Sequence, residues 1–418
     1  MIDFPNDARA SDELKARFDA AGGLSLKIGA AGLAVSLAGA LAFPSAFFPA
    51  YLAALLFWVG VSVASLGLCL LFHLAGGSWM VPLRRPFEAA GWQVGLLAVF
   101  FLPVLAGLGH TYAWTDPAVV DSMESVAYKV REIGYLTPAN FTIRAAIYFA
   151  IWGAVAFMVC GWSREQDETA GDAPSRRLWA LAGPATLVMF LSVSAAAFDW
   201  GMSRDPDWYS TIYGALYIIG SILAALSLAA IFIVRHQAYE PFKTAQNVGR
   251  LNDLGNLMLT FTMLWAYFAF SQFLIIWLGN LPEEVIFYQR RIQGLWGAVG
   301  LALIAFGFFA PFLALLQKKH KRDVAWITPI AVGILVMRLV DSAWNVLPGF
   351  AKLGSEWDGF PWVGVGFYVA ALAGIGGIWH AMFLKRLTTA RLVPLRDPTV
   401  IAAVEFDLAH EPAGDLVP

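Results

Sequence analysis

Two ionisable residues lie inside one strongly apolar segment of this sequence. Arg338 and Asp341 occur in the segment 325–346, three positions apart, so on a helix they share one face and can neutralise each other. A charged side chain deep in a bilayer is costly, and such a residue is a candidate for function. Two interpretations stay open: a structural ion pair that fixes the helix against its neighbours, or a carboxylate that handles protons beside the guanidinium.

Two histidines lie inside other apolar segments, toward the opposite membrane face. His73 and His380 could relay protons, form hydrogen bonds within a helical core, or supply the two axial imidazoles of a b-type haem. Membrane cytochromes place such histidines in pairs across a helical bundle, and here only one pair can form. The sequence favours the first two interpretations, and the proton-path candidates are His73, Arg338, Asp341 and His380.

A further group of polar residues lies where apolar segments begin or end. His110 opens the stretch HTYAWTDP, which contains Asp116, and Arg144 and Asp199 lie near the same membrane face. A quinol site needs a hydrogen-bond partner for each ring oxygen and a nearby group that takes protons near neutral pH. These four residues are therefore quinone-site candidates. A half-solvated interfacial imidazole is the simpler alternative for His110.

The composition indicates that these residues are carried by a membrane protein. Apolar residues make up 59% of the 418 residues, charged residues make up 14%, and the mean hydropathy is +0.64. Soluble domains carry roughly a quarter charged residues. The net charge of -2, without a basic patch, argues against nucleic-acid binding. Cys69 and Cys160 form no metal or haem motif, so we expect no metal and no redox cofactor bound by this chain.

The apolar segments predict an all-α polytopic membrane protein of about ten transmembrane helices. A bilayer core roughly 30 Å thick requires about 20 apolar residues per helix. The predicted spans are 24–43, 47–76, 91–110, 138–161, 177–198, 209–234, 254–279, 294–317, 325–346 and 362–384. Residues 24–384 then form the membrane domain. Residues 1–23 are an N-terminal segment and residues 385–418 are a C-terminal tail, both on the same side of the membrane.

The positions of the basic residues predict the orientation. Of the 28 Lys and Arg residues, nineteen fall on the side that holds both termini, six on the opposite side and three within spans. Positive loops stay in the cytoplasm, so both termini are predicted there. Aromatic residues on the opposite side fit an interfacial belt, namely Trp114, Trp200, Trp208, Tyr209, Trp357 and Trp362.

A weak internal repeat suggests how the spans are grouped. LVMFLSVSA at 187–195 and LVMRLVDSA at 335–343 share six of nine residues, and both lie in spans that run in the same direction. The second segment lies four spans after the first, in span 9 against span 5. This spacing predicts two parallel-repeat four-helix bundles, spans 2–5 and 6–9, with two peripheral helices. Arg338 and Asp341 of the second copy stand where the first copy has Phe190 and Val193, so only the second copy carries charged residues at these positions.

The stretch AFDWGMSRDPDWYSTIYGALYIIGS, residues 197–221, resembles a loop of the NrfD-like family, the membrane subunits of polysulfide reductases. Within that family it is most similar to ActF-type subunits of Alternative Complex III, a quinol:cytochrome c oxidoreductase of the respiratory chain. RRPFEAAGWQ at 84–93 and AYFAFSQFLIIWLGNLPEE at 266–284 support the resemblance. The resemblance implies ten helices with both termini cytoplasmic.

The resemblance also implies a role in electron transport without a redox centre in this chain. The chain would scaffold the complex, and could conduct protons or bind a quinone. The implied partners are a multihaem cytochrome c subunit with haem c, a subunit with iron–sulfur clusters, a second NrfD-like membrane subunit and small membrane-associated subunits. Alternatives from other classes are a secondary transporter of a small solute and a b-type cytochrome membrane anchor.

The central loop of the 197–221 stretch suggests a docking surface. Asp205 starts a turn, Trp208 can anchor at the membrane interface, and Arg204 can pair with Asp207 or with a partner subunit. These four residues are the partner-docking candidates. The simpler alternative is a capped start of the following helix.

Overall fold

The computed structural model describes residues 5–405, except 170, 351–361, 395, 399 and 404. Ten segments of this part are helices long and apolar enough to span a membrane. They are α1 (Asp12–Ala42), α2 (Pro44–Ala75), α3 to α5 (Arg84–Ala106), α9 (Pro138–Glu168), α10 with η5 (Ala173–Arg204), α11 (Ile212–His236), α13 (Val248–Gly279), α15 to α16 (Gly294–Leu316), α18 (Val324–Val346) and α19 (Trp362–Thr388). The described residues contain no β-strand, and the prediction of an all-α polytopic membrane protein is confirmed.

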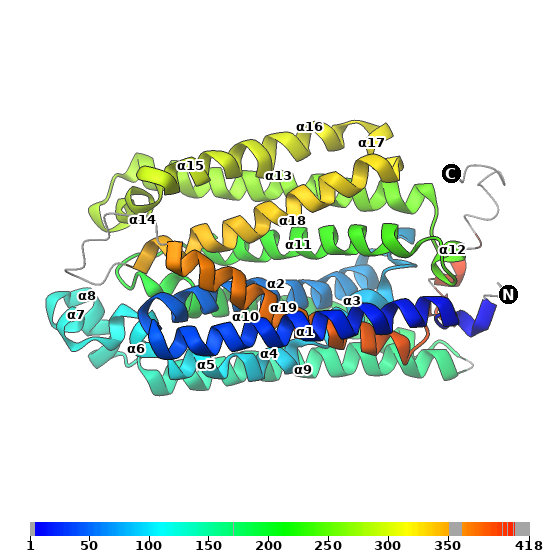
Figure 1. Ribbon diagram of the computed structural model, residues 1–418, viewed down its shortest axis with the longest axis horizontal. Helices are drawn as coiled ribbons and strands as arrows, with labels where there is room; N and C mark the ends of the chain where they lie inside the picture. The colour runs from blue at the N-terminus through cyan, green and yellow to red at the C-terminus, as the bar shows by residue number, and fades with distance from the viewer. Residues whose placement is uncertain are drawn as a thin grey trace.

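Short helices connect the spans (Figure 1). They are α6 (Leu108–Thr111), α7 (Pro117–Ser122), α8 (Glu124–Ala127), α12 (Phe242–Ala245), α14 (Pro282–Ile292) and α17 (Lys318–Arg322), with 3-10 turns at Pro5–Ala8, Ser78–Met80, Ala113–Thr115, Met202–Arg204 and Leu347–Phe350. Two segments have π-helical hydrogen bonding, Tyr128–Glu132 and η6 (Leu303–Phe309), and the second lies within the eighth span, between α15 (Gly294–Ala302) and α16 (Ala310–Leu316).

The first span is longer than its apolar segment predicts. Helix α1 begins at Asp12, where the Ser11 hydroxyl accepts a hydrogen bond from the backbone N–H of Leu14 at 3.3 Å. The added residues are polar and lie beyond the membrane-spanning part, so a hydropathy window does not include them. Leu14 and Phe18 nevertheless bury their side chains completely against the rest of the protein.

The start of α1 and the end of α19 lie at the same end of the bundle, which we call the termini end (Figure 1). Helices α6, α7 and α8 lie at the opposite, loop end. This arrangement agrees with an even number of spans. The side of the membrane that each end faces stays a prediction, and Trp357 of the predicted belt lies outside the described residues.

Helix α2 runs through the centre of the bundle and packs against α3, α10, α11, α18 and α19. It is apolar on all faces, which is the pattern of a helix surrounded by protein. Side chains of its neighbours donate hydrogen bonds to its backbone carbonyls: Tyr217 to Leu56 at 2.6 Å and Ser342 to Ala53 at 2.8 Å. Such bonds satisfy buried polar groups and hold α11 and α18 against α2.

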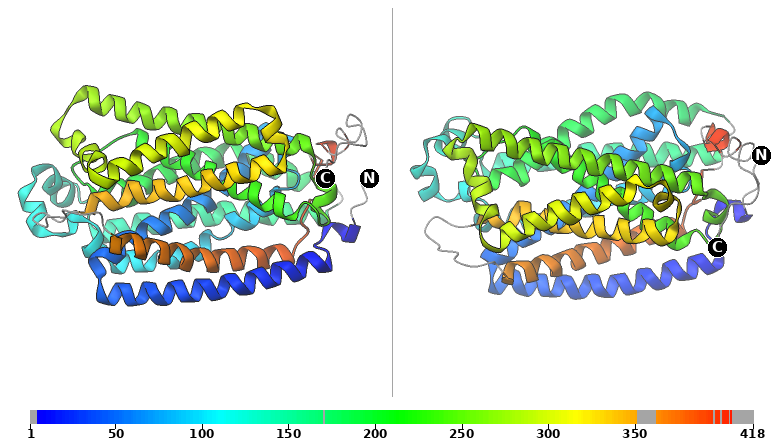
Figure 2. Two further views of the ribbon diagram at one scale, coloured as in Figure 1. Left: turned by 45° about the horizontal axis from the view of Figure 1, so that its top comes forward. Right: turned by 90° about the horizontal axis from the view of Figure 1, so that it is seen from above.

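The remaining spans divide into two groups. Helices α3 to α5, α9 and α10 pack near one another and on α2, whereas α13 and α18 pack on α11, and the α15 to α16 segment packs on α13 and α18. Helices α1 and α19 pair along one edge (Figure 2). The predicted division into bundles of spans 2–5 and 6–9 stays a prediction, because α2 packs on helices of both groups. The evolutionary repeat behind it stays a prediction.

Glycines set the distance between α1 and α19. A Cβ atom on Gly32 would lie 2.5 Å from the backbone nitrogen of Gly374, and one on Gly377 would lie 2.6 Å from the nitrogen of Gly29. The two backbones are therefore in direct contact, as in membrane helix pairs built on small residues.

Candidate functional site

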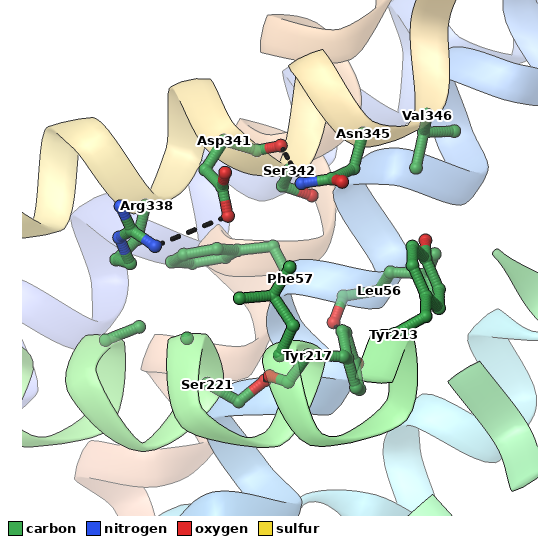
Figure 3. Close-up of a pocket in the computed structure, with 13 residues that line it drawn as sticks. Leu56, Phe57, Tyr213, Tyr217, Ser221, Arg338, Asp341, Ser342, Asn345 and Val346 are labelled. Atoms are coloured by element: carbon green, nitrogen blue, oxygen red, sulfur yellow. Dashed lines mark hydrogen bonds and ion pairs between the residues drawn. The ribbon is translucent and has the colours of Figure 1, made fainter. Parts of the chain in front are cut away.

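Arg338 and Asp341 project from α18 into the bundle, on one helix face as their spacing predicts (Figure 3). The Arg338 Nη1 atom lies 3.4 Å from Asp341 Oδ2. The Arg338 side chain is 2% exposed and that of Asp341 is 17% exposed. The pair is therefore asymmetric, because the carboxylate is more exposed than the cation.

The Arg338 guanidinium rests on an aromatic ring and beside a glycine. Its Cζ lies 3.9 Å from the centroid of the Trp265 ring on α13, which gives a cation–π contact. On the other side is Gly307 of η6, where a Cβ would lie 3.3 Å from Arg338 Nη2. Among the described residues, nothing accepts a hydrogen bond from Arg338 Nε or Nη2. π-Helical segments are frequent at functional sites, and this one faces the buried cation.

A small cavity of about 60 Å³ lies between α2, α11 and α18 (Figure 3). Its polar lining comes from Arg338, Asp341 and hydroxyl or amide side chains, which are Tyr213, Tyr217, Ser221, Ser342 and Asn345. A polar space of this size can hold water with several hydrogen-bond partners.

A second cavity, about 980 Å³ in volume, lies on the other side of Asp341, and we call it the lateral cavity. Residues of α13, α14, the α15 to α16 segment and α18 line it, and most of them are apolar. Three residues, Leu216, Asp341 and Asn345, line both cavities. Asp341 therefore lines both the small cavity, which has several polar side chains in its wall, and the large, mainly apolar lateral cavity.

Helix α14 supplies polar groups to the loop end of the lateral cavity. Arg291 donates from Nε to the Trp344 carbonyl at 3.1 Å and from Nη2 to the Asn345 carbonyl at 2.8 Å, so it caps the C-terminal end of α18. Tyr288 OH accepts a hydrogen bond from Gln272 Nε2 at 3.3 Å. Burial raises the pKa of Tyr288 to about 12, so its proton stays available for donation at neutral pH.

Of the four quinone-site candidates, the structure brings together Arg144 and Asp199. Arg144 Nε and Nη2 lie 2.7 and 3.0 Å from the two oxygens of Asp199. The hydroxyls of Tyr135 and Tyr148 donate to the same carboxylate at 2.8 and 2.7 Å. Four donors therefore satisfy this 1% exposed carboxylate, which is the arrangement of a structural ion pair.

The other two candidates lie apart from that pair. His110 stacks on the Phe48 ring with 5.6 Å between centroids, and no described residue forms a hydrogen bond with its Nδ1. Asp116 caps α7, accepting a hydrogen bond from the backbone N–H of Ala118 at 3.0 Å. A quinone site that combines all four residues is therefore not formed in this structure.

The two inner histidines also have separate environments. His380 Nδ1 lies 2.8 Å from the Ser25 hydroxyl of α1, whereas the His73 ring packs edge-on against Phe72 near the end of α2. No hydrogen bond among the described residues links either of them to Arg338 or Asp341. The proton-path candidates thus lie in three separate places, which are His73, His380 and the Arg338–Asp341 pair, and a connection between them stays a prediction.

The predicted docking loop packs on its own chain. Trp208 is 2% exposed and stacks on Phe287 of α14 with 4.0 Å between ring centroids, and Arg204 is 3% exposed. Asp205 accepts a hydrogen bond from Arg290 at 2.5 Å, and Asp207 accepts one from Ser125, also at 2.5 Å. Arg204 and Trp208 are therefore interior residues of the loop, which corrects their interpretation as exposed partner contacts.

The aromatic belt needs a similar correction. Trp114, Trp200 and Trp208 are each 2% exposed or less, because they fill the core at the loop end. Tyr209 and Trp362 are exposed, as a belt requires.

Sequence analysis missed a buried ion network at the termini end. Arg84 and Arg85 of α3 both pair with Glu88, at 3.2 and 2.8 Å. Arg84 also pairs with Asp397 of the C-terminal segment, and Arg85 with Asp167 of α9. All of these side chains are buried. Both arginines are among the nineteen cations placed on the side of the termini. The spacing of RRPFE puts Glu88 three and four residues after them, which is a readable signal of helical ion pairs.

No family model matches the chain, and no curated protein matches it either. Across the residues that the structure describes, no group of three or more His, Cys, Asp or Glu side chains could hold a metal ion. The resemblance to the NrfD-like family therefore rests on the sequence stretches that suggested it, and it enters the next subsection as a proposal.

Proposed function

We propose that the chain is a membrane subunit of a respiratory quinol:cytochrome c oxidoreductase, an ActF-type member of the NrfD-like family within Alternative Complex III. In this proposal, partner subunits with haem c and iron–sulfur clusters carry the electrons. This chain scaffolds the complex in the bacterial inner membrane and supplies acid–base groups at membrane depth.

One observation carries the proposal: Asp341 lines both the small cavity and the lateral cavity. Quinol oxidation releases protons inside the membrane, where a positioned carboxylate is an effective acceptor. Asp341 has the charge of Arg338 beside it, and the small cavity that it lines contains several hydroxyl and amide side chains, so a proton taken up there would have polar groups close by. An ionisable side chain inside a membrane span costs free energy, so its presence is by default a hypothesis of function.

The buried network at the termini end supports the scaffolding part of the proposal. Arg84, Arg85 and Glu88 join α3 to α9 and to the C-terminal segment through Asp167 and Asp397. Ion pairs of this kind fix the relative positions of the elements that they join. A rigid termini end is a suitable base for an assembly with several partner subunits.

Purification of the tagged full chain from its native membrane tests the proposal. We expect it to bring with it subunits that show c-type haem absorbance and the electron paramagnetic resonance signals of iron–sulfur clusters. The same procedure on cells that carry the untagged chain is the control. Recovery without redox partners would overturn the proposal. A Soret band that belongs to this chain alone would support the b-type cytochrome alternative, and solute uptake by proteoliposomes of the chain would support the transporter.

A further inference from the structure

The lateral cavity opens toward the lipid-facing surface of the protein. Its wall includes Tyr267 and Phe270 of α13 and Leu301 of α15, which are 65%, 61% and 69% exposed. In a membrane, side chains like these on a spanning helix face acyl chains. A molecule dissolved in the bilayer can therefore enter sideways between α13 and the eighth span. The volume of about 980 Å³ is at the upper end of the usual range for small-molecule sites.

The polar groups of the lateral cavity cluster at one end and below the membrane surface. Gln272 lies seven residues before the end of α13 at Gly279, which is roughly 10 Å along a helix. Asp341 lies five residues before the end of α18 at Val346, or about 8 Å. Tyr288 of α14 faces the same end. A ligand with a polar head and a long apolar tail would match this distribution.

The chemistry of these groups selects a neutral head. Tyr288 has a hydroxyl proton to donate, because its oxygen already accepts from Gln272. Asp341 in its ionised form is an acceptor only, so it favours a ligand hydroxyl. The hydrogen bonds of Arg291 go to backbone carbonyls, and the Asp341 carboxylate repels anions. The phosphate of a phospholipid would meet no free cation among the residues that line this cavity. To reach the cavity it would also have to leave the headgroup layer, so a neutral head group fits better.

We infer that the lateral cavity is a quinol-binding site, in which one ring hydroxyl of the quinol donates to Asp341 and the other ring oxygen accepts from Tyr288. The isoprenoid tail lies along the apolar wall formed by α13, η6 and α16 and leaves through the lipid-facing opening. The site belongs to the second group of helices, on the opposite side of α2 and α11 from the Arg144–Asp199 pair. The inference deepens the proposed function and rests on it.

Photoaffinity labelling of the complex as extracted from the membrane tests the inference, with a short-tailed azidoquinone that is reduced to its quinol before binding as the probe. We expect the labelled peptides to come from α13, α14 and the α15 to α16 segment. Excess decylubiquinol should compete with the label. Labels that concentrate elsewhere, or phospholipid that stays bound in the cavity while the probe does not label it, would overturn the inference.

Two variants with matched controls sharpen the test. Ala298→Trp should fill the lateral cavity and abolish labelling there, whereas Leu313→Trp, on the lipid-facing surface of the same span but outside the cavity, should not. Tyr288→Phe removes one hydrogen-bond donor and should raise the half-saturating probe concentration roughly threefold to tenfold. Tyr209→Phe, an exposed tyrosine outside the cavity, should leave it unchanged.

The inference and the proposed function can fail separately. If the redox partners co-purify but the probe does not label the cavity, the quinol site is wrong and the respiratory assembly stands. If the probe labels the cavity and Tyr288→Phe weakens this labelling, but no redox partner co-purifies, the quinol site stands and the proposed respiratory assembly is wrong.

Discussion

The Arg338 guanidinium and the Asp341 carboxylate form an ion pair in which both side chains line the small cavity, but only the carboxylate also lines the lateral cavity. Arg338 contacts the Trp265 ring and lies close to Gly307, and it lines only the small cavity, whereas Asp341 lines both cavities. A purely structural pair would gain by burying both partners and satisfying their remaining hydrogen bonds. This geometry instead fits a fixed cation beside a carboxylate that exchanges protons.

The ion pair gives a stability prediction that can be measured on the purified chain. Arg338→Leu removes the partner of Asp341 and should lower the free energy of unfolding by about 3–5 kcal/mol. The double variant Arg338→Leu/Asp341→Leu removes both charges and should cost much less than the sum of the two single variants. Unfolding in mixed micelles measures all four proteins. Additive losses would show that the two side chains do not interact.

The contact between α1 and α19 gives a second prediction. Gly32→Val places a side chain where the backbone of Gly374 lies, so the helices must separate, at a cost of about 1–3 kcal/mol. Gly23→Val on the same helix has nothing within 4 Å of the added Cβ and should be nearly neutral. Thermal unfolding of the two variants measures the difference. Equal melting temperatures would rule out the close contact.

The network at the termini end gives a third prediction. Arg85→Met leaves Glu88 and Asp167 without a shared buried partner and should destabilise the chain by about 3–5 kcal/mol. Arg17→Met removes an exposed pair with Glu13 and should cost less than about 1 kcal/mol. Hydrogen exchange at the start of α3 and the end of α9 locates the effect. Protection that is unchanged in Arg85→Met would contradict this account.

The Arg144–Asp199 pair gives a fourth prediction, which separates it from quinone binding. Asp199→Asn weakens four hydrogen bonds and should lower the unfolding free energy. It should not change azidoquinone labelling, because no oxygen of this carboxylate is left for a ligand. Loss of labelling in this variant, with its fold intact, would return the quinone site to the position that the sequence suggested.

The spans were predictable because lipid imposes a long apolar segment on each of them. The missed elements follow other rules. Helix α14 carries Pro282 at its start, Glu283 and Glu284 in its first turn and Arg290 and Arg291 in its last, which are readable helix signals in a stretch that hydropathy leaves as a loop. The start of α1 was missed for the same reason.

The site was only partly predictable. The three-residue spacing of Arg338 and Asp341 places both on one helix face whatever surrounds the helix. The lateral cavity depends on how α13, α14 and the π-helical segment pack, and a single sequence does not show such packing. Trp208 was misplaced because an aromatic residue in a loop has the same sequence signature at the membrane interface and under a neighbouring helix.

Quinol:cytochrome c oxidoreductase turnover in native membranes that carry Asp341→Asn tests the central claim most directly. General acid–base groups contribute about 100-fold or more, so turnover should fall by that order while c-type haem content stays normal. Asp121→Asn, an exposed carboxylate at the loop end, is the matched control and should leave turnover unchanged. Unchanged turnover and proton yield in Asp341→Asn would show that the carboxylate is structural and would contradict the account.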